Sequence, residues 1–242
     1  MAWFRELPAP RRAVAVGVTV VVVMALGVVL VGVGSGRPST PPAAAPTAAW
    51  VPAAVYEDDP LAGHGPSGVT AGVGVGFSRD EAGAVAAAVS YATAPQSWLY
   101  LSDEDVRARV EGIVVPEARD GLAGEVVQEV RLLRTELEQA SGTVWFLVSP
   151  LATRVEDYDH ESGRAVVRVW SVRVLSAEGV AVPQSGWQTT TFRLRWQDDD
   201  WKIASTHDAD GPVPQLEVGL QPWTADYMGA ELEGFVRVGA TP

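Results

Sequence analysis

The chain has no cysteine among its 242 residues. This absence excludes disulfides, thiolate zinc sites, thiol catalysis and a lipid-modified cysteine. Folded parts must therefore be stabilised by core packing, and attachment to a membrane must come from a protein segment. The sequence also has no Gly-x-Ser-x-Gly motif, so the nucleophile elbow of serine hydrolases is missing.

Positive charge is scarce. The chain has 18 Lys and Arg against 30 Asp and Glu, a formal net charge of −12. Beyond Arg37 the balance is 14 basic and 29 acidic residues, a net charge of −15. Such a surface repels nucleic acid and anionic lipid head groups, so we expect no direct nucleic-acid binding. The overall charge does not exclude a local basic patch.

Charge is missing altogether from residues 13–33, a run of 21 residues. At about 1.5 Å of rise per residue, a helix of this length spans about 31 Å, the thickness of the hydrocarbon core of a bilayer. The run predicts a single transmembrane helix. The alternative is a cleaved signal peptide ending near Ala43 and Ala45, but the apolar part of a signal peptide is usually only about 7 to 15 residues.

The basic residues around this run predict its orientation. Arg5, Arg11 and Arg12 precede it, and only Arg37 follows closely. Because positive flanks stay in the cytoplasm, residues 1–12 are predicted to be a cytoplasmic stub, and the rest of the chain to be extracytoplasmic. The expected location is the cell membrane, with a single pass.

Composition divides the remainder into three parts. Residues 34–76 are rich in Pro, Ala and Gly without a helical or strand period, which is typical of a spacer. Residues 77–212 are expected to form one α+β domain. Residues 213–242 are a C-terminal tail, in which Trp223, Tyr227, Leu232 and Phe235 suggest a short docking helix.

Three helices are predicted at the start of the domain. The Ser78-x-x-Glu81 spacing of a capping box predicts a helix from Ser78 to about Thr93. A second helix is expected to follow Ser102 and to reach Ile113, and Pro116 suits the first turn of a third. The third helix has an apolar face with 3-to-4 spacing, made of Leu122, Val126, Val130, Leu133 and Leu137.

Four strands are predicted after residue 142, at residues 143–155, 164–175, 187–196 and 201–207, which are rich in Val, Thr, Trp and Phe. In the third strand, Phe192, Leu194 and Trp196 alternate with polar residues, so one sheet face should be a core. The polar turn 197–200 predicts a hairpin to the last strand. Three helices packed on a four-stranded antiparallel sheet make a two-layer α+β domain.

This order of elements resembles the cone-shaped nuclear-transport-factor-two-like fold, in which a curved sheet wraps a long helix. Together with one membrane helix and a proline-rich spacer, it resembles the bitopic scaffold subunits of type IV secretion and conjugation machines. More narrowly, several segments are similar to membrane-anchored proteins of actinobacterial conjugative elements: residues 76–88, Leu194-Arg195-Trp196, Asp200-Trp201-Lys202 and Asp210-Gly211-Pro212.

The resemblance implies a non-catalytic structural subunit whose partners are other secretion or conjugation subunits, or copies of itself. It carries no catalytic residue, cofactor or metal with it. The same architecture also resembles the accessory membrane proteins of lipid importers of the mammalian-cell-entry type. A ligand-binding or enzymatic cone domain is a third alternative.

Two groups of residues could carry chemistry. His207, Asp208 and Asp210 end the last predicted strand, where they could reach a pocket mouth and act as a base and its orienter. The alternative is a polar turn. His160 lies in an acidic loop, residues 156–163, that could hold a divalent cation, but the loop fits no calcium-loop spacing. We therefore predict no catalytic, cofactor or metal site.

Two other features suit binding. Arg168, Arg173, Arg193, Arg195 and Lys202 lie on predicted strands and form a candidate interaction face, although cross-strand pairing with carboxylates is the alternative. The second feature is a set of tryptophans. Most of them should lie in the core, and one or two on the open sheet face could anchor a partner. They are Trp145, Trp170, Trp187, Trp196, Trp201 and Trp223.

Overall fold

The computed structural model describes residues 61, 63–140, 142–213 and 232–238. The predicted stub, the predicted membrane helix and the first part of the predicted spacer lie outside these residues, as do Trp223 and Tyr227. Among the helices that the structure describes, none has the length and apolar character needed to cross a membrane.

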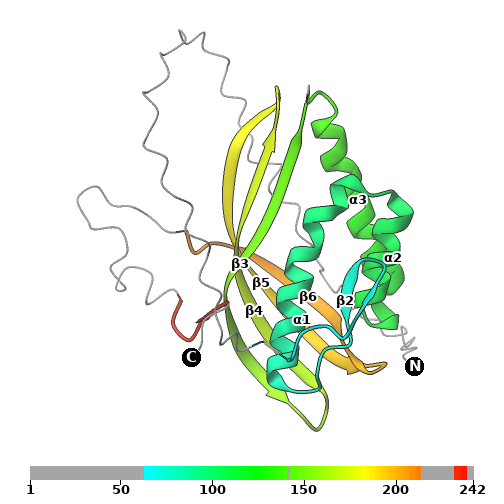
Figure 1. Ribbon diagram of the computed structural model, residues 1–242, viewed down its shortest axis with the longest axis vertical. Helices are drawn as coiled ribbons and strands as arrows, with labels where there is room; N and C mark the ends of the chain where they lie inside the picture. The colour runs from blue at the N-terminus through cyan, green and yellow to red at the C-terminus, as the bar shows by residue number, and fades with distance from the viewer. Residues whose placement is uncertain (1–60, 62, 141, 214–231, 239–242) are drawn as a thin grey trace, which may run out of the picture.

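Three helices form one layer and an antiparallel sheet forms the other (Figure 1). The helices are α1 (Glu81–Thr93), α2 (Asp103–Ile113) and α3 (Arg119–Leu137), with two short 3-10 helices, η2 (Ala94–Tyr100) and η3 (Pro116–Ala118). The sheet has the order β6-β5-β4-β3-β7. Its strands are β3 (Val144–Asp159), β4 (Arg164–Ala177), β5 (Ala181–Gln197), β6 (Asp200–Asp210) and the two-residue β7 (Val236–Arg237). The predicted α+β class, with three helices and four long antiparallel strands, is confirmed.

The helix starts follow from local capping. Ser102 caps α2 as predicted, because its hydroxyl accepts a hydrogen bond from the Asp105 backbone N–H at 3.1 Å. The predicted cap of α1 at Ser78 is wrong by two residues. Asp80 is the N-cap, and its carboxylate accepts from the Gly83 N–H at 2.7 Å and from the Ser78 hydroxyl at 2.9 Å. The ionised carboxylate is the better acceptor at the positive end of the helix.

A small hairpin precedes α1. Strands β1 (Gly68–Thr70) and β2 (Val73–Val75) are joined by Ala71 and Gly72, both with positive φ (48° and 79°), as a two-residue hairpin turn requires. These residues lie within the predicted spacer, so folded structure begins before residue 77. Three-residue strands are too short to show a countable period, which is why the sequence pattern did not reveal them.

The β5–β6 hairpin is the one that the polar turn predicts. Asp198 and Asp199 form its two-residue loop with φ of 54° and 56°, and Gln197 pairs with Asp200. All four strands extend beyond their predicted bounds. The alternation in β5 is confirmed: Phe192 and Leu194 are buried, Arg193 is exposed, and Trp196 packs against the core.

The core lies between the two layers. Helix α1 presents small buried residues such as Ala87 and Ala88, which allow it to approach the sheet closely. From the sheet, Val167, Val169 and Trp201 are fully buried. The predicted apolar face of α3 is confirmed for Leu122, Val126, Val130 and Leu133, whereas Leu137 is only half-buried at the end of the helix.

The described part of the tail differs from its prediction. Residues 232–238 form a turn followed by β7, which pairs with β3 through Thr153–Val236 and Ala152–Arg237. The predicted helix is therefore wrong for Leu232 and Phe235. Gly234, with a φ of 77°, turns the chain onto the edge of β3, where unpaired backbone groups are available.

Candidate functional site

The sheet has two unlike ends. At the end that holds the β4–β5 turn, four large apolar side chains are exposed: Trp145 (68%), Leu147 (52%), Val180 (40%) and Val182 (75%). We call these four residues the apolar tip. A shallow groove of about 560 Å³ runs beside Trp145, Val180 and Val182. Contiguous exposed apolar residues of this kind are typical of interaction surfaces.

An open strand edge lies beside the apolar tip. Strand β6 pairs with β5 only from Gln188 onward, so residues 181–186 of β5 have no neighbour on that side among the strands that the structure describes. On their other side these residues pair with the end of β4. An unpaired edge presents a row of backbone donors and acceptors to any strand that approaches it.

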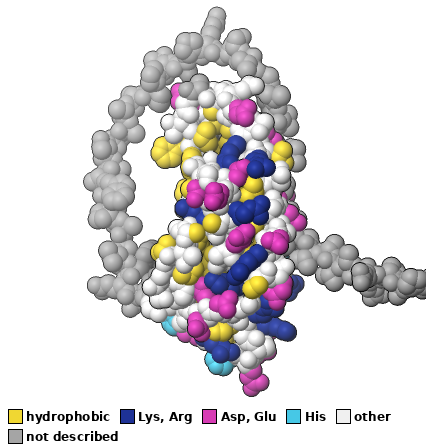
Figure 2. Space-filling view, turned by 90° about the vertical axis from the view of Figure 1, so that its right-hand side faces the viewer, with side chains coloured by type: hydrophobic (Ala, Val, Ile, Leu, Met, Phe, Trp, Pro, Cys, Tyr) yellow, Lys and Arg dark blue, Asp and Glu magenta, His cyan; other side chains and the backbone are white. Residues whose placement is uncertain are grey.

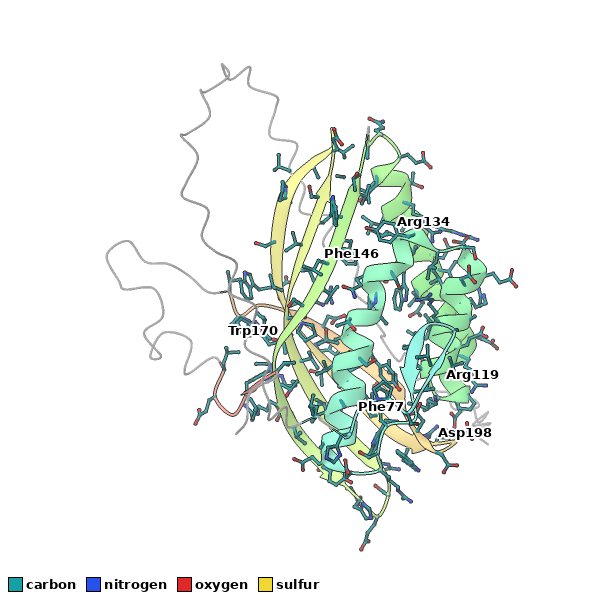
Figure 3. All side chains as sticks on the ribbon, in the orientation of Figure 1. Phe77, Arg119, Arg134, Phe146, Trp170 and Asp198 are labelled. Atoms are coloured by element: carbon teal, nitrogen blue, oxygen red, sulfur yellow. The ribbon has the colours of Figure 1, made fainter. Side chains whose placement is uncertain are left out.

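The remaining tryptophans divide between the two faces of the sheet. Trp196 and Trp201 lie in the core as predicted, with ring centroids 5.4 Å apart. Trp170 and Trp187 stack at 4.9 Å, and Trp170 lies on the face away from the helices (Figure 3). Its indole N–H donates to the Pro212 carbonyl at 3.0 Å, so this pair is covered by the end of the domain. Among the tryptophans that the structure describes, Trp145 is the one left exposed.

The structure does not bring the five residues of the candidate basic face together. Arg193 is exposed, Arg168 pairs with Glu156 at 3.3 Å, and Arg195 pairs with Glu117 at 2.7 Å. Arg173 and Lys202 are buried instead. Cross-strand and local pairing therefore accounts for part of this set, and burial accounts for the rest.

Lys202 belongs to a buried ion pair that holds elements of the fold together. Its ammonium pairs with the buried Asp200 carboxylate at 2.9 Å and donates to the Gly112 carbonyl at the end of α2, at 2.8 Å. Asp200 also accepts hydrogen bonds from the backbone N–H groups of Phe77 and Trp201. This buried pair links β6 to α2 and to the segment before α1.

The helix surface carries mixed charge rather than a single-sign patch. Figure 2 shows Lys and Arg side chains interspersed with Asp and Glu on this side of the molecule. Asp103 of α2 pairs with Arg131 and Arg134 of α3 at 2.5 and 2.6 Å, and these hydrogen bonds hold the pKa of Asp103 below its usual value. Such pairs are typical of a solvated surface.

The pocket-mouth candidates point in different directions. His207 is exposed and lines a shallow polar groove with Arg168 and Arg193. Asp208, the next residue along β6, accepts from the Thr190 hydroxyl at 2.6 Å, and burial raises the pKa of its carboxyl. Successive side chains of a strand face opposite sides of the sheet, so the two do not form a base and its orienter. Asp210 is exposed.

The acidic loop 156–163 is held by its own contacts. Asp159 accepts from the Ser162 hydroxyl at 2.6 Å and from the Glu161 N–H at 2.9 Å, and His160 lies 3.2 Å from the Tyr158 hydroxyl. Across the described ranges, the structure brings together no group of three or more His, Asp or Glu side chains that could hold a metal ion.

A small cavity of about 40 Å³ lies between the sheet and the helices. Its wall is mostly apolar, with Arg173, Thr190 and Thr206 as a polar patch contributed by β4, β5 and β6. Sequence reasoning did not identify the residues that line this cavity, because they come from four helical segments (α1, η2, α2 and α3) and three strands. It also missed the apolar tip, although apolar residues at consecutive positions 144–148 do signal a strand that is apolar on both faces.

The fold and these sites define a two-layer α+β domain with an exposed apolar tip and no assembled catalytic dyad among the candidates. The chain belongs to the family described as a domain of unknown function, DUF8175, whose family model matches residues 32–225. No curated protein sequence matches the chain. Among solved structures, it is similar to the intermembrane space region of the chloroplast protein ARC6, at 12% identity and a TM-score of 0.33, over 52% of this chain and 95% of that one.

Proposed function

We propose that this protein is a non-catalytic structural subunit of a membrane complex, and that its α+β domain associates with a second copy of the chain. The observation that carries the proposal is the apolar tip beside the open edge of β5. Water-exposed apolar groups of this size are stabilised when another surface covers them.

The open edge is the reason for choosing a second copy as the partner. When the same strand edge pairs antiparallel across a two-fold axis, each copy satisfies the backbone groups of the other and the contact closes. Val182 lies on this edge, and Trp145 supplies a large aromatic side chain of the kind that dominates interface energies. One surface thus offers both edge pairing and apolar burial.

The position of the candidate acid–base residues supports a non-catalytic role. His207 and Asp208 belong to opposite faces of β6, and Lys202 is occupied by Asp200 and the Gly112 carbonyl. Catalysis by these side chains would require a rearrangement of the strand itself.

The kind of complex follows from the sequence resemblance. With residues 13–33 as a membrane helix and a cone-like domain outside the cell, the protein fits a conjugative type IV secretion-like apparatus. An accessory role in a lipid importer is the second candidate, because that class shares the same predicted architecture. Purification of the C-terminally tagged protein from native membranes separates them: secretion ATPase and channel subunits support the first, and importer subunits the second.

Self-association can be tested cleanly because the chain has no cysteine of its own. We expect full-length Val182→Cys in native membranes to give a cross-linked dimer with a short bis-maleimide. Gln128→Cys, on the exposed surface of α3, is the matched control and should remain monomeric. Adding Trp145→Ala to Val182→Cys should reduce the dimer band. Equal cross-linking at residues 128 and 182, or none at either, would contradict the proposal.

A further inference from the structure

The cavity between the two layers has an unusual wall. Most of its lining is apolar, with Tyr91, Ile113, Val126 and Phe192 among the residues around it. Three of its lining residues nevertheless carry a buried hydrogen-bond donor that has no partner in the described part of the chain: Trp98 Nε1, Arg173 Nε and Thr206 Oγ1.

These donors are deeply buried. Trp98 is 4% exposed, Arg173 is 4% exposed and Thr206 is 7% exposed. A buried polar group without a partner destabilises a fold, and buried polar groups in native proteins are nearly always paired. Three such donors around one cavity therefore indicate that an acceptor-rich occupant completes the site. An indole N–H and a guanidinium donate hydrogen bonds and cannot accept them. The occupant must therefore supply the acceptor atoms.

The positive charge of Arg173 favours an anionic occupant. The backbone of Arg173 pairs within the sheet, but its side-chain Nε has no hydrogen-bond partner, and its guanidinium forms no ion pair with a described carboxylate. Burial lowers the pKa of its guanidinium to about 10, so it remains a cation at neutral pH. A buried cation without a bound partner is costly, and an anion in contact with it removes that cost.

The surrounding carboxylates act only at a distance. Asp208 is the acidic group whose charge favours the Arg173 cation, but no ion pair joins the two residues: its Oδ1 accepts from Thr190, and its Oδ2 is buried without a hydrogen-bond partner among the described residues. The cation at the cavity wall is therefore only partly compensated.

The volume of the cavity limits the size of its occupant. At roughly 10 to 15 Å³ for each water-sized position, a cavity of about 40 Å³ has room for only a few non-hydrogen atoms. We propose that it binds the carboxylate of a small monocarboxylic acid, with the carboxylate on Arg173, Trp98 and Thr206. The short alkyl part then packs against Ile113 and Phe192. This proposal does not depend on self-association through the apolar tip.

The test is calorimetric titration of the full-length protein, held in a maltoside detergent, with sodium propionate. We expect one site per chain. Propionamide, which has the same shape without the charge, should bind at least tenfold more weakly. Octanoate tests whether the carboxylate can also belong to a longer amphiphile: tighter binding than propionate assigns the site to a fatty acid, and weaker binding to a free short-chain acid.

Variants then locate the site. Thr206→Val removes one donor at nearly constant volume, and Trp98→Phe removes another while keeping an aromatic ring in a smaller side chain. Each should weaken propionate binding about three- to tenfold, whereas Arg173→Met should weaken it at least tenfold. Arg193→Met, on the exposed part of β5, is the matched control and should leave the dissociation constant unchanged. Because Thr206→Val is close to isosteric, it keeps the test decisive if Arg173→Met fails to fold.

Three outcomes would overturn the proposal. One is the absence of saturable binding of both propionate and octanoate, which would leave water as the occupant. Another is equal affinity for propionate and propionamide, which would remove the role of the Arg173 charge. The third is an unchanged dissociation constant in both Trp98→Phe and Thr206→Val, which would place the carboxylate elsewhere.

Discussion

The two ends of the sheet differ in what covers them. At the end with the β5–β6 turn, Trp201 is fully buried and donates its indole N–H to the Ser78 carbonyl at 2.9 Å. Its ring makes an edge-to-face contact with Trp196 and a tilted contact with Tyr158. At the other end, Trp145 of β3 is 68% exposed. The same residue type in the same sheet is thus a core anchor at one end and a surface group at the other. The difference shows that one end contributes to the core, and it supports the proposal that the other end contacts a second copy of the chain.

The strongest test of this comparison is to truncate both tryptophans. Trp201→Ala should lower the free energy of unfolding by about 4 kcal/mol, because it leaves a large cavity and an unpaired Ser78 carbonyl. Trp145→Ala should change it by less than about 0.5 kcal/mol in the monomer, as exposed sites usually do. Urea unfolding of both variants provides the measurement. Similar losses would show that the apolar tip is part of the core.

The buried ion pair of Lys202 and Asp200 provides a second comparison between a buried and an exposed side chain. Lys202→Met should destabilise the domain by about 3 kcal/mol, because it leaves the Asp200 carboxylate buried without its cation. Arg193→Met, which removes an exposed cation from the neighbouring strand, should have little effect. Thermal unfolding at fixed pH compares the two. An unfolding temperature of Lys202→Met close to that of Arg193→Met would show that the pair does not hold β6 to α2.

Helix α3 allows a matched comparison between adjacent residues. Leu133 is buried and Leu132 is 66% exposed. Leu133→Ala should cost about 2 kcal/mol or more, and Leu132→Ala less than about 0.5 kcal/mol. Equal costs in urea unfolding would mean that the apolar face of α3 is wrongly assigned.

The smallest expected effect concerns pH. Burial raises the pKa of Glu129 from its ordinary value of 4.5 to about 7, so the folded state holds the proton more tightly than the unfolded chain does. The stability that this proton contributes is fully present below about pH 4.5 and is lost as the pH rises through about 7. Between pH 6 and 8, wild type should lose stability relative to Glu129→Gln. Parallel stability curves over this range would show that Glu129 titrates normally.

Much of the fold could be predicted from local patterns. The 3-to-4 spacing of Leu122, Val126, Val130 and Leu133 identifies the buried face of α3, and Ser102 identifies the start of α2. Alternation around Phe192 and Leu194 identifies the inner face of β5. These signals are local, because each depends on residues within about three turns of one helix or within one strand.

The candidate site could not be predicted in the same way. Arg168, Arg173 and Arg193 look alike in sequence, yet Arg173 is buried and Arg193 is exposed, since strand register and the position of the helices decide which side chain meets the core. His207 and Asp208 are neighbours in sequence but belong to opposite faces of β6. The β1–β2 hairpin was missed because its strands are only three residues long.

The amino-acid sequence by itself determined the class of the domain, the number and order of its helices and long strands, and the faces that they bury, because hydrophobic spacing and capping act within single elements. Only the tertiary structure decided that Trp145 is exposed while Trp201 is buried, that Lys202 meets Asp200 and Gly112, and that three unpaired donors surround one cavity. These arrangements depend on residues far apart in the chain, whose proximity arises only when the helices pack on the sheet.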